Sequence, residues 1–140
     1  LSADLAALSK ERDYSQPNTV ANSTLIGDVN NRNVLLVDDI IDTGGSVVAA
    51  VTELKQRGAN NIVVACAHPV FSGPAWNRLT ELRQRAEAEG WEFQVAGTST
   101  IDHPQAPAWY WQFPIEQLVA NVLEKINSRG SVTGVQNHQH

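Results

Sequence analysis

The chain has 140 residues, which is the size of a single domain. It carries 10 Lys and Arg against 15 Asp and Glu, a formal net charge of −5, which argues against a broad nucleic-acid or anionic-membrane surface. Hydrophobic residues make up 42% of the chain and charged residues 18%, as in globular rather than disordered proteins. No apolar run is long enough to span a membrane, and Leu1–Ser9 lacks the basic start of a signal peptide. We therefore expect a globular domain that binds neither nucleic acid nor membranes.

The chain ends and the single cysteine give further expectations. Because there is no Met and the sequence begins at Leu1, we expect a fragment whose native start is missing. Cys66 stands alone in an apolar stretch, which predicts a small core residue and a reducing, cytoplasmic location. Residues 1–135 are expected to form the domain, and the polar residues 136–140 a disordered tail.

Strands and helices are predicted to alternate along the chain. Polar residues 13–24 show no periodicity, which predicts a mobile loop. In chain order, the expected elements are a strand at Asn33–Val37, a helix at Val47–Arg57 ended by Gly58, a strand at Ile62–Ala67, a turn at Phe71–Pro74, a helix at Ala75–Glu89 ended by Gly90, a strand at Phe93–Ala96, a short strand within Pro104–Phe113, and a helix at Ile115–Ile126 with Pro114 in its first turn. This alternation predicts an α/β fold with a largely parallel sheet flanked by helices.

Residues 38–46, directly after the first expected strand, carry the strongest chemical signal. The small residues that open the next helix are Thr43, Gly44, Gly45 and Ser46. Their backbone N–H groups can converge on an anion, and a helix N-terminus favours negative charge. Asp38 and Asp39 supply acceptors for sugar hydroxyls or for a metal-bound sugar. The segment therefore suits a sugar phosphate, and it lacks the Gly-Lys-[Ser/Thr] ending of a P-loop.

A purely structural interpretation of the same loop stays open. Thr43 or Asp42 would then be no more than the N-cap of the following helix. Two adjacent aspartates at the end of a buried strand favour a ligand, because ionised groups there are costly without a partner. Since a bound phosphate would repel Asp42, we expect this carboxylate to shape the loop or to point toward the reacting carbon.

Three other residues with functional side chains are expected to have structural roles. His68, followed by Pro69, is expected to build the turn after a strand and to make a poor metal site on its own. Trp109 and Trp111 alternate around Tyr110, so they are expected to share one face if that stretch is a strand.

Residues 34–46, Val-Leu-Leu-Val-Asp-Asp-Ile-Ile-Asp-Thr-Gly-Gly-Ser, resemble the phosphoribosyl-diphosphate motif of type I phosphoribosyltransferase folds. Three further stretches are similar to the ribose-phosphate diphosphokinase family: Ala67–Ala75, Val95–Ile101 and Leu123–Val135. The resemblance runs in family order from about Asp4 to Val135. It implies a type I phosphoribosyltransferase-like fold and the C-terminal part of such an enzyme.

Enzymes of this family transfer the diphosphoryl group of ATP to the anomeric hydroxyl of ribose 5-phosphate, release AMP, require Mg²⁺ and form homo-oligomers. By this resemblance, Asp42–Ser46 would hold the 5-phosphate, and Asp38, assisted by Asp39, would contact the ribose hydroxyls. The family's metal ligands and most of its ATP-binding residues lie upstream of residue 1. The resemblance thus implies no metal ligand in this chain, which is expected to bind ribose 5-phosphate and to be inactive alone.

The resemblance also assigns a catalytic loop. Lys10 matches the family's catalytic lysine and Arg12 the arginine that grips the substrate, and residues 9–24 would close over the site. Glu11 stands where the family has an arginine. Without the resemblance, Lys10 and Arg12 are interpreted as a solvated charged turn.

Two alternative functions remain at this point. A phosphoribosyltransferase of nucleotide salvage shares the motif, but it should lack His68–Ala75 and the tail Ser131–Thr133 that this chain has. A non-catalytic, synthetase-associated regulatory protein should have altered loops, whereas Lys10, Arg12 and Asp38–Ser46 are intact.

Overall fold

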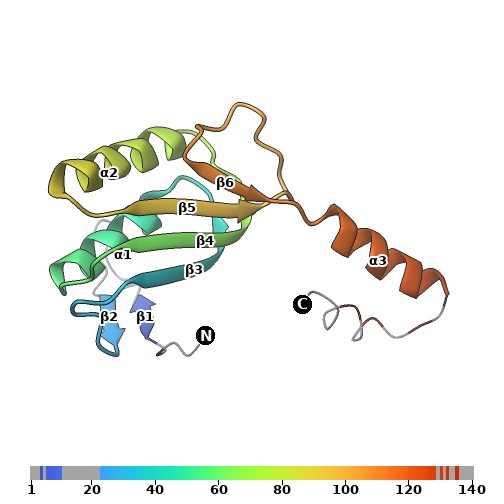
Figure 1. Cartoon of the computed structure of the whole chain (residues 1–140), viewed down its shortest axis with the longest axis horizontal. Helices are drawn as coiled ribbons and strands as arrows, with labels where there is room; N and C mark the ends of the chain where they lie inside the picture. Colours follow the sequence, from blue (N-terminus) through green and yellow to red (C-terminus); the bar gives the residue numbers. More distant parts are fainter. Residues whose placement is uncertain are drawn as a thin grey trace, which may run out of the picture.

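The computed structural model describes residues 4, 6–10, 23–128, 130, 132 and 135. Its strands are β1 (Ala7–Lys10), β2 (Ser23–Ile26), β3 (Val34–Ile41), β4 (Ile62–Pro69), β5 (Phe93–Thr98) and β6 (Tyr110–Phe113). Its helices are α1 (Gly45–Gln56), α2 (Ala75–Glu89) and α3 (Glu116–Asn127). Figure 1 shows β3 to β6 side by side in one twisted sheet, with β1 and β2 forming a separate small sheet.

The main sheet is parallel throughout and follows chain order, β3-β4-β5-β6. Val34 pairs with Ile62, and Ile62 with Phe93, so these strands begin at the same edge. Because all four strands run the same way, their carboxyl ends share the other edge, where ligands of open α/β sheets bind. The predicted α/β fold with a parallel sheet is confirmed.

One face of this sheet carries the hydrophobic core. Apolar residues of α1 and α2, among them Val47, Val51 and Leu79, form a single buried cluster with inward-facing strand residues such as Val64 and Val95. The burial of these side chains is the main stabilising contribution that holds both helices on the sheet.

The other face of the sheet is apolar and largely open. Leu35 and Val37 of β3 are 63% and 70% exposed, and Trp111 and Phe113 of β6 are both 55% exposed. Strand alternation explains the division, because successive side chains point to opposite faces.

Strand bounds differ from those predicted. The strand expected to end at Val37 continues through the aspartates to Ile41, since the parallel ladder extends to a pairing of Ile41 with Pro69. For the same reason β4 runs to Pro69, so His68 lies within a strand and the prediction of a turn there is wrong. Tertiary pairing here outweighs the polar local sequence.

The prediction of a loop at residues 13–24 is wrong at its C-terminal end, and the sequence analysis predicts no strand where β1 lies. Ser23 and Thr24 belong to β2, which pairs antiparallel with β1, Lys10 lying opposite Ser23. Four-residue strands show too few alternations to be recognised from sequence. Residues 11–22, which hold the rest of that loop, lie outside the described part of the chain.

Helix α3 extends away from the sheet (Figure 1). None of its residues is buried, although Val119, Leu123 and Ile126 are apolar. It begins one residue later than predicted, with Ile115 at the N-cap, so Pro114 precedes the helix rather than lying in its first turn. Among the described residues, no helix combines the length and apolar character of a membrane span.

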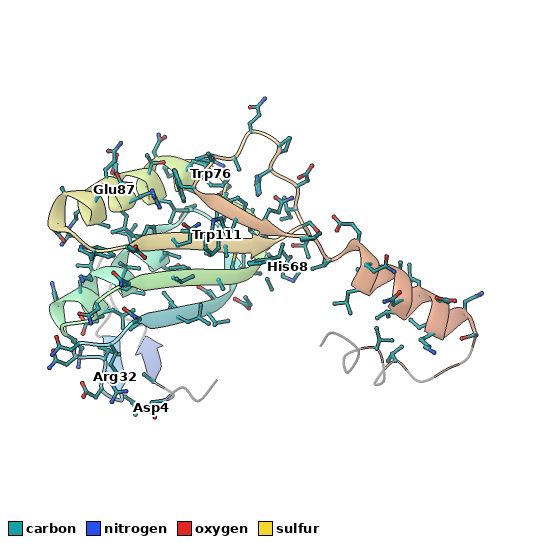
Figure 2. All side chains as sticks on the ribbon, viewed as in Figure 1. Asp4, Arg32, His68, Trp76, Glu87 and Trp111 are labelled. Atoms are coloured by element: carbon teal, nitrogen blue, oxygen red, sulfur yellow. The ribbon has the colours of Figure 1, made fainter. Side chains whose placement is uncertain are left out.

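The prediction that Trp109 and Trp111 share a face is wrong. β6 begins at Tyr110, so Trp109 lies outside the strand's alternation and packs edge-on against Trp76, with ring centroids 6.1 Å apart. Figure 2 shows Trp76 on α2 and Trp111 on the sheet.

Candidate functional site

The loop between β3 and α1 lies at the carboxyl edge of the sheet. Gly44 is the N-cap of α1, and no side chain caps the helix. The interpretation of Thr43 or Asp42 as a side-chain N-cap is therefore wrong. Gly44 has a φ of +75°, a left-handed backbone conformation that favours glycine.

Asp38 and Asp39 are polar residues near the carboxyl end of β3, shortly before the loop. Asp38 is half-buried and Asp39 is exposed, as expected for successive residues of a strand. The backbone N–H of Asp39 donates to Asp38 Oδ1 at 3.0 Å, and that of Ile40 donates to Asp39 Oδ1 at 2.8 Å. Carboxylate oxygens are hydrogen-bond acceptors of the kind that sugar hydroxyls can donate to.

Cys66 lies beside Asp38 in the parallel register. Burial and, secondarily, the charge of Asp38 raise the pKa of the Cys66 thiol to about 11. The thiol is therefore protonated at neutral pH, which agrees with the predicted role of Cys66 as a core residue.

Asp42 accepts a hydrogen bond from the turn that follows the neighbouring strand β4. The Ser72 hydroxyl donates a hydrogen bond to Asp42 Oδ1. Of the two roles expected for Asp42, this contact fits the shaping of the loop. The next residue, Thr43, accepts a hydrogen bond on its carbonyl oxygen from Arg78 Nη1 at 2.9 Å.

No role was predicted for Ser72 or Arg78. The sequence signal for Ser72 is its place in the turn after β4, because adjacent parallel strands bring their following loops together at one edge. Arg78 lies in the first turns of α2, so it faces the same edge from the helix layer. Finding either contact requires the order of strands and helices, which the local sequence does not contain.

Further polar groups gather at the ends of β4 and β5. His68 Nδ1 lies 3.2 Å from Thr100 Oγ1, and the hydroxyls of Thr98 and Thr100 both donate to the carbonyl of Ala67, at 2.6 and 2.9 Å. Figure 2 shows His68 at this edge of the sheet. The edge therefore presents hydroxyl and imidazole groups beside the two aspartates.

The predicted catalytic residues are only partly described. Lys10 lies at the end of β1, opposite Ser23. Arg12 and Glu11 lie outside the described residues, as do Ser131 and Thr133. Within the part of the chain that the structure describes, no group of three or more His, Cys, Asp and Glu residues is arranged to hold a metal ion.

Comparisons with known proteins point to one family. Residues 1–117 match the model of the phosphoribosyl transferase domain. The ribose-phosphate pyrophosphokinase of Mycobacterium leprae is 36% identical over 131 residues, and that of Corynebacterium efficiens is 37% identical over 134 residues. Each match covers 94% of this chain but 38% of the relative, so the chain spans well under half the length of these proteins.

The solved structures agree with the sequence comparison. The crystal structure of phosphoribosylpyrophosphate synthetase from Mycobacterium smegmatis matches with a TM-score of 0.64 and 31% identity, over 78% of this chain and 35% of that one. This similarity confirms the predicted type I phosphoribosyltransferase-like fold. Because the family model matches most of its length, the chain belongs to the phosphoribosyl transferase domain family.

Proposed function

We propose that residues 38–46 bind ribose 5-phosphate. The 5-phosphate would lie on Asp42–Ser46 at the start of α1, and the ribose hydroxyls would be bound by Asp38 with the help of Asp39. The observation that carries the proposal is the start of α1, where Gly44 adopts a left-handed conformation and no side chain caps the helix. Backbone N–H groups at such a start favour an anion.

We also propose that the whole protein, of which this chain forms a part, is a ribose-phosphate diphosphokinase. In that reaction O1 of ribose 5-phosphate attacks the β-phosphorus of ATP and loses its proton, while the bond between the β-phosphorus and the AMP oxygen breaks. Lys10 and Arg12 would place positive charge near the transferred group, because phosphoryl transfer depends on positioning and charge stabilisation. The names of the related proteins support this assignment.

Mg²⁺ belongs to this proposal as a cofactor that would neutralise charge on the diphosphate. The carboxylates of Asp38 and Asp39 are hard oxygen donors of the kind that Mg²⁺ accepts. When Mg²⁺ is bound, these carboxylates and the phosphate oxygens would supply oxygen ligands. ATP would be bound mostly outside this chain, so the chain alone is expected to be inactive.

We propose that the protein is cytoplasmic and that it forms a homo-oligomer. Support for assembly comes from two apolar surfaces that the described residues leave uncovered. One is the open sheet face around Val37 and Trp111, and the other is the apolar side of α3 around Leu123.

A salvage phosphoribosyltransferase and a regulatory protein are the alternatives. The relatives reported above are named as pyrophosphokinases, which supports the synthetase over the salvage enzyme. The loop Asp38–Ser46 retains its aspartates and glycines, which supports a ligand-binding role over a purely regulatory one.

A calorimetric titration of ribose 5-phosphate into the 140-residue chain, with Mg²⁺ present, tests the binding proposal. Asp38→Asn is the test variant, and Asp28→Asn is a matched control, since Asp28 precedes β3 and lies toward the opposite edge of the sheet. We expect saturable binding that Asp38→Asn weakens at least about tenfold, the range for a lost charged hydrogen bond, while Asp28→Asn has no effect. Absence of binding at millimolar ligand, or equal affinity in all three proteins, would contradict the proposal. Steady AMP formation by the chain alone would contradict its expected inactivity.

A further inference from the structure

Residues 41–43, just before the N-cap Gly44, are all held by the segment of residues 71–78, which comprises the end of the β4–α2 connection and the first turn of α2. The contacts are Phe71 N–H to the Ile41 carbonyl at 3.0 Å, the Ser72 hydroxyl to the Asp42 carboxylate, and Arg78 Nη1 to the Thr43 carbonyl at 2.9 Å. Three successive tethers from one segment fix the path of the chain just where it enters α1.

Aromatic packing around Phe71 holds the segment of residues 71–78 in place. Phe71 has a φ of +48°, a left-handed conformation that is unfavourable for a bulky side chain. Its ring is buried against Trp76, His103 and Tyr110, with centroids 4.4, 5.2 and 5.4 Å away. Aromatic packing thus offsets the backbone strain and keeps the segment in place against the loop.

The contact of Arg78 determines which way one peptide group faces. No described peptide bond is cis, and in a trans peptide the C=O and the following N–H point in opposite directions. With the Thr43 carbonyl turned toward Arg78, the N–H of Gly44 points away from Arg78. An unrestrained peptide could instead rotate its carbonyl oxygen toward the anion, which would repel it.

Gly45 leaves room for this arrangement. A Cβ at position 45 would lie 3.4 Å from Arg78 Nη1, in tight contact with the guanidinium. Arg85 of the same helix makes a contact of another kind, because it forms an ion pair with Glu89 one helical turn away. Arg78 instead uses one of its five N–H donors on the loop backbone.

We propose that Arg78 is a positioning residue of the phosphate loop. It holds the Thr43 carbonyl against α2, and it thereby keeps the Gly44 N–H directed into the proposed phosphate site and adds positive charge beside it. This inference rests on the proposed binding of ribose 5-phosphate by the loop.

The test compares Arg78→Ala and Arg78→Lys with Arg85→Ala in the full chain. Arg85 is a matched control because it lies on the same helix, is half-exposed, and forms its ion pair with Glu89 of its own helix. We expect Arg78→Ala to weaken ribose 5-phosphate binding about tenfold or more, as for loss of a charged hydrogen bond. Arg78→Lys should restore part of the affinity, as should added methylguanidinium with Arg78→Ala, and Arg85→Ala should change it less than about twofold. If Arg78→Ala does not fold, the intermediate affinity of Arg78→Lys carries the test.

A second measurement separates this inference from the proposed function. In the absence of ligand, the amide NMR signals of Gly44 and Gly45 should shift in Arg78→Ala and stay unchanged in Arg85→Ala. If the wild-type chain does not bind ribose 5-phosphate, the proposed function fails, and unchanged amide signals would overturn the role of Arg78 independently. Wild-type affinity in Arg78→Ala overturns the inference even if the signals move, because the loop would then bind without its tether.

Discussion

Tyr110 carries a buried hydroxyl that has no hydrogen-bond partner among the described residues. The hydroxyl lies against Gly97, where an added Cβ would collide with it and would lie 3.0 Å from the Cβ of Pro69. A glycine at position 97 therefore lets β5 accommodate both β6 and the end of β4. An unpaired buried hydroxyl gives no stability to the fold, so its place here is explained by packing of the ring.

Substitutions of Tyr110 and Gly97, made singly and together, test this explanation of the packing. We expect Tyr110→Phe to be neutral or stabilising by up to about 1 kcal/mol, because it removes a buried group that has lost its water. Gly97→Ala should destabilise by about 1–3 kcal/mol through overpacking, and by less when combined with Tyr110→Phe. Urea unfolding of the two single variants and the double variant measures this coupling. A loss of more than about 1 kcal/mol in Tyr110→Phe would show that the hydroxyl has a stabilising partner.

Two buried titratable groups, Cys66 of β4 and Tyr110 of β6, make the stability of the fold depend on alkaline pH. Burial, and secondarily the charge of Asp38, raises the pKa of Cys66 from 9.0 to about 11, and burial raises that of Tyr110 from 10.0 to about 12. Above pH 9 the unfolded chain loses these protons first, so the folded state binds more protons and stability falls as pH rises. Unfolding measured from pH 8 to 11 should show this decline, with a shallower slope in Cys66→Ala. An equal slope in both proteins would contradict the assignment to Cys66.

At the scale of elements, the helices divide into two that build the core and one that does not. Leu79 of α2 is fully buried, whereas Leu123 of α3 is 59% exposed. Both are leucines within helices, so substitution by alanine changes helix propensity little and reports mainly on burial.

These two leucines give a direct comparison. We expect Leu79→Ala to destabilise by about 2–5 kcal/mol, through lost burial and the cavity left behind. At dilutions where the chain is monomeric, Leu123→Ala should change the unfolding free energy by less than about 0.5 kcal/mol, as at other exposed sites. Chemical denaturation of both variants checks the pair. A comparable loss for Leu123→Ala would mean that α3 packs on a surface in solution.

Prediction from the sequence worked where the signal was local. The helix at Ala75–Glu89 was predicted with the bounds that the structure gives, because its apolar spacing and the glycine after it lie within the segment. The strand ending at Val37 was predicted too short, since pairing with β4 carries it through Asp38 and Asp39. Trp109 was misplaced because β6 begins one residue after it, so the alternation of the strand does not extend to Trp109.

The candidate site shows the same division. The loop Asp42–Ser46 could be recognised because a strand, small residues and a helix start follow one another in the sequence. Its tethers from Ser72 and Arg78 could not, because they join segments about 30 residues apart through the order of the parallel strands.

At the scale of the whole molecule, the described residues cover the main sheet with helices on one face and leave apolar side chains exposed on the other. Parallel sheets are normally covered on both faces, and here the uncovered face is apolar around Leu35, Val37 and Trp111. An apolar surface of this kind marks an interaction site.

If the proposed homo-oligomer forms through this apolar face, substitutions on the face should weaken association. We expect the chain to associate in a concentration-dependent manner in sedimentation velocity, and the double variant Val37→Thr with Trp111→Thr to shift it toward monomer, because both changes reduce the apolar area that association buries. Asn77→Ala, an exposed change on α2, serves as the control. A monomer at every concentration, or association untouched by the double variant, would contradict an assembly through this face.

The most direct test of the account is to locate the phosphate. Amide signals are followed while ribose 5-phosphate is titrated into the full chain, with ribose in a parallel titration. We expect the amides of Gly44, Gly45 and Ser46 to shift in a saturable way with ribose 5-phosphate and to stay in place with ribose, because only the phosphate is an anion for the start of α1. Saturable shifts confined to another part of the chain, or identical shifts with both sugars, would contradict the assignment of a phosphate site to this loop.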